Sequence, residues 1–179
     1  MANRNQTRGH TREGIDTMRY RASNGYGLIL LTFVAALMLS VIPLPQWAAA
    51  YRPEWIAMVL IYWCMALPER IGVVTAWLIG LLLDVLTGAL LGQHALALAL
   101  VAFLTLKLYQ RIRVFPLWQQ ALSIMVLVAM QQMVSLWVKG VIGMAPGNWT
   151  YWMPSITSML LWPWLFIILR DFRRRFGIS

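Results

Sequence analysis

Hydrophobic residues fall into six runs of roughly 20 residues, and short stretches rich in proline, glycine or charge separate these runs. A helix of roughly 20 apolar residues crosses the hydrocarbon core of a bilayer, which is about 30 Å thick. The pattern therefore predicts six membrane-spanning helices with short loops and no separate soluble domain. The expected spans are residues 27–44, 52–67, 71–92, 94–109, 117–138 and 149–169.

Prolines and polar tails mark the limits of the predicted membrane domain. Pro43 and Pro45 end the first span and Pro68 ends the second, because proline cannot continue a hydrogen-bonded helix. The N-terminal segment is polar and rich in arginine, which is typical of a disordered cytoplasmic tail. We therefore expect three parts: a basic tail over residues 1–24, a membrane domain over residues 25–170, and a second basic tail over residues 171–179.

The distribution of basic residues predicts the orientation of the chain. Cytoplasmic loops of membrane proteins collect Lys and Arg, whereas exported loops do not. With six spans and both termini in the cytoplasm, only Arg52 and Lys139 of the 15 basic residues lie on the outer side. Five spans would place the C-terminal arginines outside, against this rule. The predicted fold class is therefore an all-α protein of the bacterial inner membrane, with six transmembrane helices and cytoplasmic N- and C-termini.

Composition supports a membrane protein and narrows its partners. Hydrophobic residues make up 60% of the chain and charged residues only 12%, a balance that a soluble domain of this size cannot bury in one core. The net charge of +9 sits in the tails and between apolar runs, so we expect anionic membrane lipid rather than nucleic acid as its counter-charge. Cys64 is the single cysteine, which excludes a disulfide within the chain.

Asp84 is the one acidic residue that lies well inside a predicted span. A carboxylate at this depth is costly, so its side chain is expected to face protein or water rather than lipid. Small residues at every fourth position let two helix backbones approach closely. Such a stripe surrounds Asp84 and comprises Gly72, Ala76, Gly80, Gly88 and Gly92. Two interpretations stay open: simple helix packing with Asp84 hydrogen-bonded into it, or a functional pocket.

Other polar side chains are predicted at the same depth as Asp84. Gln131 and Gln132 lie equally deep in the fifth span, and Ser155, Thr157 and Ser158 reach a similar level in the sixth. Together with Arg52, Glu54 and Thr87 they would line a cavity that opens outward. Hydrogen bonds between neighbouring helices would explain each of these residues separately.

The residue inventory argues against an enzyme. The chain has two histidines, and the second, His94, is expected to be a cap or interface residue at the start of a helix. A metal site needs several convergent ligands, and intramembrane aspartyl hydrolysis needs a pair of carboxylates, whereas only Asp84 is available. We therefore expect no metal, no cofactor and no catalytic residue. Two classes remain: a small-molecule-binding or transport subunit with an outward-facing cavity, or a scaffold that holds other membrane proteins.

Several short motifs, taken in order, resemble the rod shape-determining protein MreD family, in its proteobacterial form. The resemblance covers about residues 19–178, and its most diagnostic element is Asp-x-x-Thr-Gly-x-x-x-Gly, formed by Asp84, Thr87, Gly88 and Gly92. The other matching motifs are Tyr51-Arg52-Pro53-Glu54-Trp55, Ala66-Leu67-Pro68, Leu117-Trp118-Gln119-Gln120-Ala121-Leu122 and Leu161-Trp162-Pro163-Trp164. Residues 1–17 lie outside the match.

The resemblance implies a non-catalytic subunit of the cell-elongation machinery that builds the lateral peptidoglycan wall of rod-shaped bacteria. Its implied partner is MreC, a single-span protein, in a hetero-oligomer that acts indirectly on a penicillin-binding transpeptidase, RodA and MreB. The implied fold is similar to the substrate-binding subunits of energy-coupling-factor transporters. The resemblance assigns no role to Asp84, Thr87, Gly88 or Gly92 beyond their places in the motif.

Overall fold

The computed structural model describes residues 26–45, 48, 50–143 and 149–175. Three helices are long and apolar enough to cross a membrane, namely Gln93–Ile112 (α5), Leu117–Val141 (α6) and Trp149–Arg175. The last of these consists of a 3-10 turn, Trp149–Trp152 (η1), followed by Met153–Arg175 (α7). Three shorter apolar helices are Tyr26–Val41 (the first helix), Trp55–Ala66 (α3) and Val73–Thr87 (α4). Each predicted span therefore coincides with a helix, whereas the predicted tail over residues 1–24 lies outside the described residues.

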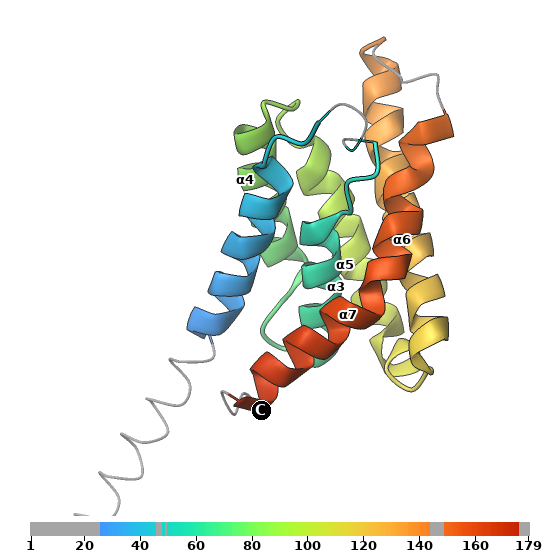
Figure 1. Ribbon diagram of the computed structural model, residues 1–179. Coiled ribbons are helices and arrows are strands. Elements are labelled where there is room, and N and C mark those ends of the chain that lie inside the picture. Colours follow the sequence, from blue (N-terminus) through green and yellow to red (C-terminus); the bar gives the residue numbers. More distant parts are fainter. Residues whose placement is uncertain (1–25, 46–47, 49, 144–148, 176–179) are drawn as a thin grey trace, which may run out of the picture.

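The helices form one bundle in which consecutive helices run in alternating directions (Figure 1). The start of the first helix and the end of α7 lie at the same end of the bundle, as an even number of crossings requires. Neighbours in sequence pack together, since α4 contacts α5, α5 contacts α6 and α6 contacts α7. The regular secondary structure of the described residues is therefore entirely helical.

Helix α3 lies at the centre of the bundle, and its ten consecutive residues from Ile56 to Met65 are all buried. A helix that is apolar on every side is typical of a protein core or of a membrane span. Here the surroundings are protein, because α3 contacts α5, α6 and α7, and its Trp63 Nε1 donates a hydrogen bond to Thr32 Oγ1 of the first helix at 2.8 Å. At about 1.5 Å per residue α3 is only about 18 Å long, so it is too short to cross the hydrocarbon core of a bilayer.

Some helix boundaries differ from the prediction. α3 begins at Trp55 rather than at residue 52, and α7 continues to Arg175, past the predicted end at residue 169. Helix α4, which corresponds to the third predicted span, ends at Thr87 rather than at Gly92, because Gly88 takes a left-handed conformation with φ 63°. Glycine adopts this conformation without a Cβ clash, and it is a common helix C-cap. Gly92 has φ 98° and directly precedes α5.

The stripe of small residues brings two helices together at one position only. A Cβ atom added to Gly80 would lie 2.3 Å from Ala95 Cα, so the backbones of α4 and α5 meet there. Ala76, one turn earlier, is also fully buried. Gly72 and Gly88 have open space where a Cβ would be, so neither glycine lies against another helix there. Both flank α4, Gly72 as its N-cap and Gly88 as its C-cap.

We expect Gly80→Ala to destabilise the protein, because the added methyl group would force α4 away from α5. Overpacking of this kind typically costs about 1–3 kcal/mol. The matched control is Gly140→Ala in α6, where nothing lies within 4 Å of the added atom. Thermal unfolding in detergent should show a lower midpoint for Gly80→Ala and an unchanged or higher midpoint for Gly140→Ala. Equal midpoints for the two variants would contradict the close approach at Gly80.

Candidate functional site

A polar cavity of about 190 Å³ lies at the N-terminal end of α3. It is lined by residues from the segment before α3, from α5 and α6, from η1 and from the start of α7. The lining residues are Ala50, Glu54, Gln93, His94, Gln131, Gln132, Ser135, Lys139, Thr150, Tyr151 and Pro154. Three residues predicted to share an outward cavity, Glu54, Gln131 and Gln132, are thus brought together although they are far apart in the sequence.

Glu54 connects three elements at this cavity. Its side-chain Oε2 accepts a hydrogen bond from Gln131 Nε2 of α6 at 3.1 Å. Its backbone N–H donates to Ser158 Oγ of α7 at 3.0 Å. The residue directly precedes α3, where unpaired N–H groups carry partial positive charge, so a carboxylate is favourable there. Glu54 therefore complements the end of the central helix and joins it to α6 and α7.

Gln132 and Tyr151 form a reciprocal pair across the cavity wall. Gln132 Nε2 donates to the backbone carbonyl of Tyr151, and the Tyr151 hydroxyl donates to the backbone carbonyl of Gln132, both at 3.0 Å. Because a carbonyl only accepts, the Gln132 amide must turn its nitrogen toward Tyr151. The same argument turns the Gln131 nitrogen toward the carboxylate of Glu54. The side-chain oxygens of Gln131 and Gln132 therefore point away from Glu54 and from Tyr151, respectively.

Three buried polar atoms of the lining residues have no hydrogen-bond partner in the described part of the chain. They are the amide oxygens of Gln131 and Gln132 and the amide nitrogen of Gln93. These residues are only 2%, 4% and 4% exposed. Buried polar groups normally find a partner, because leaving one unpaired costs about 1–3 kcal/mol. The cavity therefore presents two acceptors and one donor, beside a carboxylate, to a polar guest.

Asp84 contacts His94, which lines this cavity, and it caps helix α5. Its Oδ2 accepts from the Gly92 N–H at 2.8 Å, and its Oδ1 accepts from the His94 N–H at 2.9 Å and from His94 Nδ1 at 2.7 Å. The first N–H groups of a helix lack partners within the helix, and Gly92 has no side chain to supply one. The close approach at Gly80, one turn before Asp84, brings the carboxylate within reach of them. Asp84 of α4 thus takes part in helix packing as the cap of the neighbouring helix α5.

The geometry of His94 follows from this cap. Because a carboxylate oxygen accepts, Nδ1 of His94 carries the proton, and Nε2 is left for another partner. His94 also lines the cavity, with 20% of its side chain exposed. The expectation that His94 is a cap or interface residue is consistent with this position, but its contact with Asp84 was not predicted.

Other predicted pocket residues do not line the cavity. Thr87 is exposed and its hydroxyl donates to the Leu83 carbonyl of its own helix, and Gly88 and Gly92 form the turn after α4. The Arg52 guanidinium instead donates to the Ser40 and Ile42 carbonyls at the end of the first helix. These carbonyls lack helical partners, so Arg52 acts as a cap for that helix.

The sequence-based prediction also missed part of the lining. Gln93, Ser135, Lys139 and Tyr151 face the cavity but were not among the predicted residues. Two of these residues could have been predicted from the sequence, because Gln93 adjoins the Asp84 motif and Ser135 lies one helical turn from Gln131. In the described residues, no three His, Cys, Asp or Glu side chains come together to hold a metal ion. The arrangement can bind a polar group through hydrogen bonds.

Comparison with known proteins identifies relatives of the whole membrane domain. Residues 21–172 match the family described as rod shape-determining protein MreD. The "Rod shape-determining protein MreD" of Haemophilus influenzae is 33% identical over 147 residues, which cover 82% of this chain and 91% of that protein. No solved structure matches the chain, and the expected likeness to energy-coupling-factor transporters stays a prediction. The two matches confirm the resemblance seen in the sequence motifs.

We expect Asp84→Leu to be more damaging than Asp84→Asn. Asn keeps one oxygen acceptor for the N-terminus of α5, whereas Leu leaves all of these N–H groups unpaired, at about 1–3 kcal/mol each. Even Asn should lose stability, because its NH₂ group would face an N–H donor. Thermal unfolding in detergent and protein abundance in membranes would measure the order wild type, Asn, Leu.

The control for the cap is Thr87→Val, which removes a hydroxyl that bonds only within α4 and should change stability by less than about 0.5 kcal/mol. A Leu variant as stable as the Asn variant would contradict the capping role. Equal loss of cell shape with both Asp84 variants at normal protein levels would instead indicate a need for the ionisable group.

Proposed function

Because the chain belongs to the MreD family of rod shape-determining membrane proteins, we propose that it is a non-catalytic subunit of the cell-elongation machinery in the inner membrane. In this role it binds MreC and thereby regulates lateral peptidoglycan synthesis by the penicillin-binding transpeptidase and RodA, coordinated with MreB. Support for a non-catalytic role comes from Asp84 and His94. Both oxygens of the Asp84 carboxyl group are engaged in capping α5, and one of them also contacts Nδ1 of His94.

We propose that the α3 N-terminal end of the bundle faces the periplasm and the α3 C-terminal end faces the cytoplasm. The support is the positive-inside rule. The described basic residues at the α3 N-terminal end are Arg52 and Lys139. The other described basic residues follow α3 or lie in the last turns of α5 and α7, which end on the α3 C-terminal side. They are Arg70, Lys107, Arg111, Arg113, Arg170, Arg173, Arg174 and Arg175.

The observation that supports MreC binding best is an apolar groove of about 220 Å³ between the first helix, α3 and α7. Its walls are Leu28, Leu31, Thr32, Ala35, Ala36, Leu39, Trp55, Val59, Leu165, Ile168, Leu169 and Phe172. From Leu28 to Leu39 it follows three turns of the first helix, so it is elongated along the helix axes.

The chemistry of this groove suits a transmembrane helix. The hydroxyl of Thr32 is already engaged, since it donates to the Ile29 carbonyl and accepts from Trp63. The small residue Ala35 is exposed and allows another backbone to approach, which is how helices associate in lipid without a hydrophobic driving force. We therefore assign the groove to the single transmembrane helix of MreC.

A photo-crosslinking residue placed at Leu39 is expected to crosslink to MreC in cells, because Leu39 lines the groove. The matched control is Val126 on α6, which is 52% exposed against 43% for Leu39 and does not line the groove. An immunoblot for MreC after irradiation measures the adducts. Equal MreC adducts from both sites, or lipid adducts alone from Leu39, would contradict this docking site.

A second candidate function, favoured by the three unpaired buried atoms, is binding of a small polar molecule in the cavity at Glu54. Native mass spectrometry of the purified protein should then show a bound adduct in the wild type that is lost in Glu54→Gln, which removes the carboxylate and keeps its shape. An adduct-free wild-type spectrum, or an adduct equally retained by the variant, would count against this function.

A further inference from the structure

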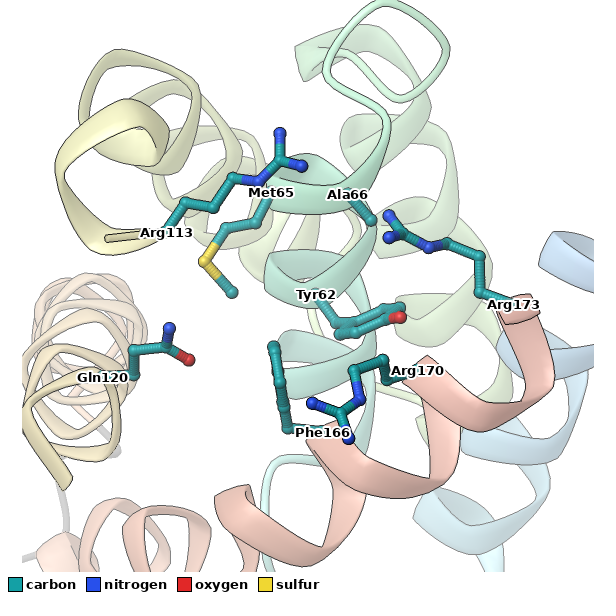
Figure 2. Close-up of a pocket in the computed structure, with 8 residues that line it drawn as sticks. All are labelled: Tyr62, Met65, Ala66, Arg113, Gln120, Phe166, Arg170 and Arg173. Carbon is teal, nitrogen blue, oxygen red and sulfur yellow. The ribbon is translucent and has the colours of Figure 1, made fainter. Parts of the chain in front are cut away.

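We propose that the pocket at the α3 C-terminal end binds a phosphate group. The pocket encloses about 80 Å³ between α3, the end of α5, α6 and α7 (Figure 2). Its lining residues are Tyr62, Met65, Ala66, Arg113, Gln120, Phe166, Arg170 and Arg173. Figure 2 shows the three arginines arranged around Tyr62 and Phe166, with Arg113 and Arg173 reaching the last turn of α3 from opposite sides.

The charge of this pocket is unbalanced. Three guanidinium groups line it and no carboxylate does. Within the described residues, no carboxylate pairs with any of these three guanidinium groups. Arg113, Arg170 and Arg173 therefore have no acidic partner in this part of the chain.

The end of α3 balances only a small part of this charge. Because α3 ends inside the bundle, its last carbonyls present the negative end of the helix dipole to Arg113 and Arg173. A helix dipole is equivalent to about half an elementary charge, whereas three arginines carry three. The remaining positive charge is accessible to an external anion, because Arg113 and Arg170 are exposed and Arg173 is half-buried.

The geometry and size of the pocket favour phosphate among anions. The planar guanidinium group of arginine presents paired N–H donors that match phosphate oxygens. The volume is well below the roughly 300 Å³ of sites for drug-sized ligands, so the pocket suits a single phosphate rather than a nucleotide. Arg170 and Arg173 are three residues apart on α7, hence neighbours on one face of the helix.

Two further features fit a phosphate that carries a hydroxylated substituent, as in the headgroup of phosphatidylglycerol. Gln120 Nε2 donates to the Phe115 carbonyl at 3.0 Å, which leaves its buried Oε1 without a donor in the described residues. A hydroxyl group of the ligand would supply that donor. Met65, Ala66 and Phe166 form an apolar wall for the adjoining glycerol carbons. Free phosphate and a lipid headgroup share the chemistry that the arginines recognise.

The test uses the full-length protein in detergent and compares Arg173→Gln with Arg174→Gln. Both variants remove one positive charge from the same helical turn, but Arg174 does not line the pocket. Native mass spectrometry would titrate phosphatidylglycerol against each protein, with phosphatidylcholine as the zwitterionic lipid control. We expect about a tenfold loss of phosphatidylglycerol affinity for Arg173→Gln and less than about twofold for Arg174→Gln.

Inorganic phosphate in the same titration distinguishes the two sources of the ligand. Competition by millimolar phosphate that is lost in Arg173→Gln would support a phosphate site filled by the free ion. Equal losses in the two variants, or equal binding of the two lipids, would overturn the proposal. Gel filtration of both variants would establish that they are folded before the comparison.

Discussion

The rest of the structure depends on the complete burial of a short helix, α3. Its apolar side chains point in every direction and are buried, because the first helix, α5, α6 and α7 pack around it. At about 18 Å, α3 is too short to cross the hydrocarbon core of a bilayer, which is about 30 Å thick. Polar side chains of other elements lie at both of its ends. Glu54 lies at the positive end of its dipole, and Arg113 and Arg173 lie at the negative end.

The same constraint explains the other polar contacts in the bundle. Unpaired backbone groups at a helix end are costly where water is scarce, so neighbouring elements supply the caps. Asp84 of α4 caps the start of α5, and Arg52 caps the end of the first helix. The close approach of the helices at Gly80 makes the first of these caps possible. Polar side chains thus cap the end of the first helix and the start of α5, and the two polar pockets lie at the two ends of α3.

The sequence predicted each helix because the length of an apolar run matches the thickness of the bilayer that a helix must cross. It also placed Gln131 at the depth of the predicted cavity by counting residues from the span ends, and in the structure Glu54, Gln131 and Gln132 line one cavity. The end of α4 at Thr87 was missed, since small residues at every fourth position look alike whether they pack a helix or form a left-handed turn. The arginine pocket could not be predicted, because Arg113 and Arg170 meet only through the packing of α5 and α7 around α3.

We propose that the recessed ends of α3 open to opposite sides of the membrane, with the arginine pocket on the cytoplasmic side. Single cysteines at Lys139 and Arg113 mark the two sides, and Cys64 is buried in α3, so the unmodified chain is the control. Labelling of spheroplasts with a membrane-impermeant maleimide measures which cysteine faces the periplasm. We expect labelling of Lys139→Cys in spheroplasts and of Arg113→Cys only after lysis. Labelling of both in spheroplasts, or the reverse order, would show that this orientation is wrong.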